Sequence, residues 1–226
     1  YMAASEKNTV ASVSENGFMR FTQDLGRVKA SEGRFMIGYD DQYSVQYFGE
    51  NLRPYWNRTG DLTIESQFEL ADKEYRKLAK KAEEFDCTLM EEATEAGGKK
   101  YAELCALAYR QAIAGHKLTW HDGEVQFLSK ENYSNGCIGT VDVTYPSIPL
   151  FLLYDPTLVE GMLNPIFKML EEGLWEFDFA PHDVGTYPLA NGQVYGYSMV
   201  HRARRQPLDS QMPVEECGNM ILCVAA

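Results

Sequence analysis

Carboxylates in glycine- and proline-bounded turns are the residues of this sequence best suited to chemistry. They fall in three stretches in the second half of the chain, at 130–152, 179–192 and 212–220. Burial beside apolar side chains and a second carboxylate raises a carboxyl pKa towards the range of a general acid. The residues that we predict to be catalytic are Asp142, Asp183, Glu216 and Glu131.

Two types of reaction use such groups. In glycoside hydrolysis one carboxylic acid protonates the leaving oxygen, while a second carboxylate activates water or attacks the sugar. Amide hydrolysis needs a nucleophile or an activated water, a proton donor and an oxyanion site. The candidates for these roles are Cys137, Thr140, Ser134 and His182. The residues that we predict to bind the substrate are Lys130, Asn132, Tyr145, His182, Glu215 and Asn219.

Each of these residues also has a purely structural interpretation. Pro213 at a helix start would make Glu215 and Glu216 favourable charges in the first turn. Asp142 would bond to turn amides, and His182 with Asp183 would form a capped turn. The prediction of a site therefore depends on three similar clusters in one half of the chain, and not on any single residue.

Composition excludes several classes of protein. The 226 residues are 45% hydrophobic and 12% aromatic, which is enough to build a substantial core. The net charge of −12 argues against a nucleic-acid partner, because phosphates would be repelled. The one basic cluster of the sequence, 201–205, is predicted to be a solvated loop. No run of about 18 apolar residues occurs, so we expect no membrane span.

Cysteine usage and the two ends of the chain give further expectations. The five cysteines are an odd number without a CxxC pair, which indicates neither a disulfide framework nor a zinc site. We therefore expect buried free thiols. No metal ligand and no cofactor are assigned from the sequence, and a metal requirement stays open. The chain begins at Tyr1 and ends in the apolar run NMILCVAA. We expect an internal piece of a longer polypeptide, whose other parts are partners of this one.

The elements that must position the clusters begin with strands. Residues 9–13 and 18–21 lie on either side of an Asn-Gly pair, a strong signal for a β-hairpin. Two further runs, 34–39 and 43–48, lie on either side of an Asp-Asp pair that we assign to a turn. We interpret residues 1–62 as the C-terminal part of an antiparallel β-sandwich domain.

From residue 63 onward helical patterns dominate, with apolar side chains three or four residues apart. The predicted helices cover 66–96, 99–118, 145–154, 156–172 and the residues from Pro213 onward. The second of them is expected to be buried on more than one side, and a turn with a short strand is expected at 121–128. We interpret 63–226 as a domain of stacked helical hairpins with its polar loops at one end, so the chain has an α+β multidomain fold.

Long stretches of the sequence resemble the glutaminase A family of fungi and gut Bacteroides-type bacteria. They are YDDQYSVQYFGENLRPYW, YAELCALAYRQAIAGHKL, FLSKENYSNGCIGTVDVTYPSIPLFLLYDP, APHDVGTYPLANGQ and MPVEECGNMILCVAA. The resemblance implies a β-rich N-terminal domain, then a six-helical-hairpin domain of the (α/α)6 type that is truncated at its C-terminus. It also implies a secreted or periplasmic protein. Fungal members are called L-glutamine amidohydrolases, and the architecture otherwise belongs to six-hairpin glycosidases.

The sequence departs from the pattern of that family at two positions. Cys137 and Cys217 stand where a serine is expected, which argues against a serine nucleophile at either place. We therefore expect a hydrolase that releases ammonia from a small-molecule substrate, L-glutamine. Asp142, Asp183 and Glu216 would act as acid/base groups or as ligands of the substrate ammonium.

Two other functions stay open. A six-hairpin glycoside hydrolase would act on a glycan with a carboxylate pair, and a carboxyl separation of roughly 5 to 9.5 Å would fit it. Its sugar-stacking residues would be Trp56, Trp120, Trp175 or Tyr145. The third possibility is a non-catalytic glycan-binding or scaffold protein that has kept the fold.

Overall fold

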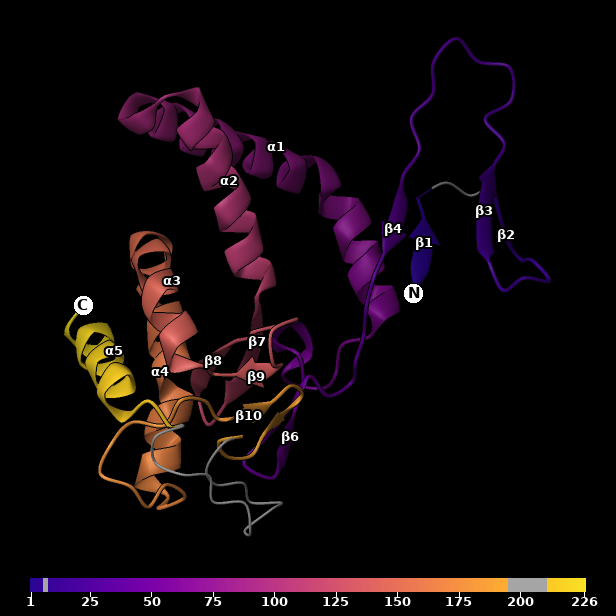
Figure 1. Cartoon of the computed structure of the whole chain (residues 1–226). Coiled ribbons are helices and arrows are strands. Elements are labelled where there is room, and N and C mark those ends of the chain that lie inside the picture. The colour runs from indigo at the N-terminus through magenta and orange to yellow at the C-terminus, as the bar shows by residue number, and fades with distance from the viewer. Residues whose placement is uncertain (6–7, 195–210) are drawn as a thin grey trace. The chain divides into compact units, whose positions relative to one another are not determined.

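The computed structural model describes residues 1–5, 8–194 and 211–226 (Figure 1). Its contacts divide the chain into two compact units. The first unit combines Tyr1–Asp40 with Asp61–Phe85, and the second combines Asp41–Gly60 with Asp86–Ala226. A domain boundary between 62 and 63 stays a prediction. The basic cluster 201–205, predicted to be a solvated loop, lies outside the described residues.

The first unit is rich in β-structure, as predicted. Its strands are β1 (Met2–Ala4), β2 (Thr9–Val13), β3 (Met19–Gln23) and β4 (Phe35–Ile37). Strands β2 and β3 form the predicted hairpin, with Val13 opposite Met19. Strand β4 pairs with β1, so that Phe35 lies opposite Ala4. The four strands therefore make two separate antiparallel ladders.

The two long helices are α1 (Ile64–Gly97) and α2 (Lys99–Ala114). Thr63 and Ser66 cap the start of α1 reciprocally, each backbone N–H donating to the side chain of the other. Gly98, with φ of 82°, separates the two helices at the predicted stop. The prediction that α2 is buried on more than one side is wrong, because Ala102 is its only buried residue among those the structure describes.

Helix α2 also ends four residues before the predicted position 118, because the chain turns at Gly115 into a strand. This strand, β7 (His116–His121), pairs along its whole length with β8 (Glu124–Ser129). Sequence analysis predicted only the second half of this hairpin. Helix α4 (Pro156–Glu171) packs against β8 at Gly161, where a Cβ atom would lie 2.9 Å from a side-chain carbon of Val125 and 3.1 Å from its carbonyl oxygen.

The second unit contains a five-stranded sheet that the sequence did not predict. Its order is β6 (Glu50–Leu52), β5 (Val45–Tyr47), β11 (Leu189–Ala190), β10 (Gly185–Thr186) and β9 (Cys137–Ile138). Strand β11 pairs with β5 in parallel, and the other pairs are antiparallel. The sheet places two of the polar stretches, 130–152 and 179–192, next to each other.

Three further helices complete the second unit (Figure 1). They are α3 (Val141–Tyr154), α4 (Pro156–Glu171) and α5 (Pro213–Ala225), and a short 3-10 helix covers Tyr55–Asn57. Helix α3 packs against both α4 and α5. Asp155 caps α4 by accepting a hydrogen bond from the Thr157 N–H at 3.1 Å, as its sequence predicts. Helix α3 begins four residues before the predicted start, which places Asp142 in its first turn.

The α+β fold with a β-rich N-terminal part and a helical part is confirmed. The core of the second unit joins side chains of α3, α4, β5, β8 and β9, and its largest fully buried members are Tyr47, Phe151, Leu128, Ile138, Met162, Ile166 and Met169. Among the described residues, no helix is both long and apolar enough to span a membrane. All five cysteines are free thiols, although only Cys137 and Cys223 are buried.

His116 makes the stability of this core sensitive to pH. Its ring stacks on Phe127 with centroids 4.5 Å apart, and its Nδ1 lies 2.6 Å from the Ala112 carbonyl oxygen. Burial lowers the pKa of His116 to about 4. Because a histidine in the unfolded chain titrates near pH 6.5, the unfolded state binds a proton that the folded state does not, so stability falls as pH decreases from about 6.5 towards 4.

We expect the wild type to lose about 2 kcal/mol of unfolding free energy between about pH 7.5 and about pH 5 through this residue alone. His116→Phe keeps a ring against Phe127 and removes the titrating group. Urea unfolding of both proteins at the two pH values measures the difference. An equal loss in the variant would contradict the assignment of this pH dependence to His116.

Candidate active site

A buried histidine and aspartate form the centre of the candidate site. His182 and Asp183 are 3% and 0% exposed, and His182 Nδ1 lies 2.8 Å from Asp183 Oδ2. The other carboxylate oxygen of Asp183 accepts hydrogen bonds from the backbone N–H groups of Gly185 at 2.8 Å and Val194 at 3.1 Å. Asp183 is thereby fixed, and it holds the imidazole ring with Nε2 turned away from it.

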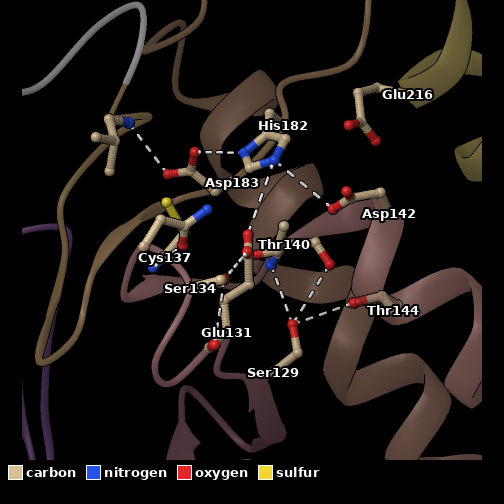
Figure 2. A network of polar contacts seen from close by, with 12 residues as sticks. Ser129, Glu131, Ser134, Cys137, Thr140, Asp142, Thr144, His182, Asp183 and Glu216 are labelled. Carbon is tan, nitrogen blue, oxygen red and sulfur yellow. Dashed lines mark hydrogen bonds and ion pairs between the residues drawn. The ribbon is translucent and has the colours of Figure 1, made fainter. Parts of the chain in front are cut away.

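Nε2 of His182 faces two further carboxylates (Figure 2). It lies 3.7 Å from Asp142 Oδ1 and 3.8 Å from Glu131 Oε1. Glu131 is held from its other side by Ser134, whose hydroxyl donates to Oε2 at 2.7 Å. Burial alone would lower the pKa of His182, but the hydrogen bond and charge of Asp183 and the charge of Asp142 raise it above its ordinary value.

Glu216 adds a carboxylate from the first turn of α5. Its side chain is fully buried, and Oε2 accepts a hydrogen bond from Asn219 at 3.4 Å. One oxygen each of Asp142 and Glu216 and one ring nitrogen of His182 lie within 4.8 Å of one another. Burial, followed by the charge of Asp142, raises the pKa of Glu216 to about 7. The arrangement therefore concentrates negative charge at the N-terminal ends of α3 and α5, where helix dipoles favour it.

Backbone and hydroxyl contacts join the loops that carry these residues. Ser129, at the end of β8, accepts a hydrogen bond from the Thr140 N–H at 3.0 Å, and its Oγ lies 3.3 Å from Thr144 Oγ1. The Val141 N–H donates to the His182 carbonyl at 2.8 Å. Ser129 was not among the predicted residues, and its only sequence signal is its place directly before the polar stretch.

The structure brings together six of the residues predicted for the site: Glu131, Asp142, His182, Asp183, Glu216 and Asn219. The other four lie elsewhere on the surface. The ammonium of Lys130 lies over the Tyr187 ring, the Asn132 side chain donates to the Lys130 carbonyl, and Tyr145 and Glu215 are exposed. Their predicted contacts with a substrate stay predictions.

The two cysteines that replace expected serines have different surroundings. Cys137 is buried in β9, and burial together with the charges of Asp183 and Glu131 raises the pKa of its thiol. A thiol in this setting stays protonated and is a poor nucleophile. Cys217 accepts a hydrogen bond from the Ala180 N–H at 3.3 Å, which ties the stretch before His182 to α5.

Trp175 is not available as a sugar platform. It is 6% exposed, it packs edge-on against Phe177 and Phe179, and its indole N–H donates to the Phe179 carbonyl. Trp120, on β7, contacts Tyr55 and the Arg58 guanidinium instead of the cluster. The sequence could not separate these roles, because a tryptophan in a core and one at a binding surface have the same local pattern.

Comparison with known proteins identifies similar chains. Residues 98–226 match the family model described as Glutaminase A six helical-hairpin domain, and residues 2–92 match a domain of unknown function. The whole chain is 32% identical over 232 residues to Glutaminase A of Aspergillus oryzae, of which it spans 32%. Over 142 residues, 62% of the chain, it is 30% identical to a probable glutaminase of Arthroderma benhamiae, of which it spans 15%. No solved structure matches.

Proposed function

The chain belongs to the glutaminase A family, and we propose that it takes part in hydrolysing the side-chain amide of L-glutamine to glutamate and ammonia. The observation that carries this proposal is the buried His182–Asp183 pair, which faces the carboxylates of Glu131, Asp142 and Glu216. The names of both fungal relatives support the same reaction class.

The cluster supplies the groups that hydrolysis of an amide by water requires. A carboxylate removes a proton from the attacking water, and a proton returns to the leaving nitrogen, so one water is consumed for each ammonia released. Direct attack by water fits the protonated state of Cys137 better than a covalent thioester does. Asp142, whose side chain is 32% exposed, is the carboxylate of the cluster that a substrate reaches most easily.

Surplus negative charge favours an amino acid as the substrate. Four carboxylates surround one imidazole, whereas glycoside hydrolysis uses two. The α-ammonium of L-glutamine would be attracted to such a site, and a neutral sugar would not.

We expect the protein, assayed as its organism produces it, to release ammonia from L-glutamine. Its kcat/KM for N-acetyl-L-glutamine should be lower by a factor of about ten or more. The acetyl group removes the ammonium, and a hydrogen bond to a charged group contributes about 1.5 to 3 kcal/mol. A coupled assay of kcat/KM for the two amides measures the difference. Equal values would contradict recognition of the ammonium, and no ammonia from either amide would contradict the proposed reaction.

A glycoside hydrolase is the second candidate, and the closeness of two carboxylates favours it. Oxygens of Asp142 and Glu216 lie within 4.8 Å of each other, so the two groups form a pair of the kind that glycoside hydrolysis uses. The two carboxylates are thus not widely separated. A wide separation would have argued against this function. Sugar release from aryl glycosides, together with no ammonia from L-glutamine, would select this candidate.

A further inference from the structure

Three carboxylate oxygens of the site have no hydrogen-bond partner within the part of the chain that the structure describes. They are Glu131 Oε1, Asp142 Oδ1 and Glu216 Oε1, and all three atoms are buried. Glu216 is itself 0% exposed. Buried polar atoms are nearly always paired in folded proteins, because an unpaired one costs about 1 to 3 kcal/mol and a charged one costs more. These oxygens lack a hydrogen-bond partner among residues 1–5, 8–194 and 211–226.

A positively charged partner would suit these oxygens, because several carboxylates meet here. Among the described residues, no lysine or arginine forms an ion pair with Glu131, Asp142, Asp183 or Glu216, and their only cationic neighbour is the His182 ring. Lys130, the next residue to Glu131, places its ammonium over the Tyr187 ring instead. One imidazolium balances one carboxylate, so buried negative charge remains.

The donor atoms have the spacing of a metal site. Metal to oxygen or nitrogen distances of about 2.0 to 2.2 Å place two ligands of one ion roughly 3 to 4 Å apart. His182 Nε2 and Asp142 Oδ1 are 3.7 Å apart, and the ligand atoms of Asp142, His182 and Glu216 all lie within 4.8 Å of one another. A small rotation of the side chains would bring all three donors to a common ion.

Asp183 provides the support that metal-binding histidines have. A histidine that binds a metal through one ring nitrogen usually donates its other N–H to a carboxylate, which fixes the tautomer and the orientation of the ring. Asp183 Oδ2 occupies this place at 2.8 Å from Nδ1, and it is anchored in turn by the Gly185 and Val194 N–H groups. Once an ion displaces the Nε2 proton, Nε2 would offer its lone pair at a position 3.7 Å from Asp142 Oδ1.

We propose that Asp142, His182 and Glu216 bind one divalent transition-metal ion of the Zn²⁺ or Mn²⁺ class. An imidazole nitrogen with two carboxylates suits these ions better than Ca²⁺, which prefers oxygen ligands alone. Glu131, whose Oε1 lies 3.8 Å from His182 Nε2, would then be close enough to accept a proton from a water on that ion. The ion's role in hydrolysis rests on the proposed function, whereas its binding does not. The sequence had assigned no metal ligand, and none of these three donors is a cysteine.

Metal content and calorimetry test the binding without any substrate. The naturally produced protein, purified without chelator, is expected to contain about one equivalent of Zn²⁺ or Mn²⁺ by elemental analysis. After chelation it is titrated with ZnCl₂, MnCl₂ and CaCl₂. Asp183→Asn, which only positions His182, should weaken binding of the preferred ion by about 10- to 100-fold. Asp142→Asn should weaken it at least as much, and Asp178→Asn, which changes an exposed carboxylate, should not.

Spectroscopy distinguishes this ligand set from a second possible set that shares His182. Mn²⁺ bound at the site should show coupling to one imidazole nitrogen, and His182→Gln should abolish it. Glu131, Cys137 and His182 also offer atoms within 4.8 Å of one another. A thiolate-to-metal absorption band after Co²⁺ loading would assign the ion to that set and overturn the proposal, as would the absence of any binding to the folded protein.

The outcomes for metal binding and for hydrolysis are separable. Ammonia release from L-glutamine that is unaffected by removal of the bound ion would contradict a role of the ion in hydrolysis, and it would leave both its binding and the proposed function intact. A bound ion with the expected response to Asp183→Asn, but no turnover of L-glutamine, would support the site and contradict the proposed function. Thermal unfolding of each variant shows whether a loss of binding reflects a loss of folding.

Discussion

Asp142→Asn and Glu216→Gln are each expected to lower kcat/KM for ammonia release from L-glutamine by about a hundredfold or more. Both substitutions keep the shape of the side chain and remove a negative charge from the atoms that surround His182 Nε2. Asp142 is the more accessible group and Glu216 is fully buried. Steady-state kinetics of the naturally produced protein and its two variants measure the effect.

Matched substitutions of exposed carboxylates serve as controls. They show whether a lower kcat/KM comes from a change in the site or from the loss of any negative charge. Asp178→Asn and Glu171→Gln make the same chemical changes on the surface, and they should leave kcat/KM unchanged. Circular dichroism and thermal unfolding check that Asp142→Asn and Glu216→Gln remain folded. Variants that are folded and release ammonia at the wild-type rate would show that the reaction takes place elsewhere in the protein.

The residue types of the site could be predicted from sequence, because they are concentrated in polar stretches that contain glycine and proline. Glu131, Asp142, His182 and Asp183 come from two such stretches, and the structure places them around one imidazole. Several helix ends could also be predicted, because each depends on neighbouring residues. Asp155, Gly98 and Pro213 mark helix ends through hydrogen bonds and backbone angles that involve only adjacent residues.

Other features could not be predicted, because they depend on contacts between distant residues. The strands β9, β10 and β11 have two residues each, and β11 pairs in parallel with β5, about 140 positions earlier. Two-residue strands carry no periodicity. The same limit applies to Glu215 and Glu216, which share a helical turn. One helical step of about 100° turns one inward and the other outward, and only the packing of α5 decides which.

Gly185→Ala is expected to destabilise the second unit by about 2 to 5 kcal/mol, as measured by chemical denaturation. Gly185 has a φ of 146°, which side-chain-bearing residues rarely adopt, and a Cβ atom there would overlap the Leu189 carbonyl oxygen. That oxygen belongs to β11, whose pairing with β10 joins the site loops to the sheet. The clash therefore cannot be relieved by rotation of a side chain.

The control is Gly123→Ala, in the turn between β7 and β8. Gly123 also has a positive φ, 88°, but nothing lies within 4 Å of the added Cβ, so this substitution should cost only about 1 to 2 kcal/mol of backbone strain. The excess cost at Gly185 measures the overlap with Leu189. Because the Gly185 N–H also anchors Asp183, the variant should lose ammonia release even under conditions where it remains folded. Equal costs at the two glycines, with full activity of Gly185→Ala, would show that neither the sheet nor Asp183 depends on this close contact.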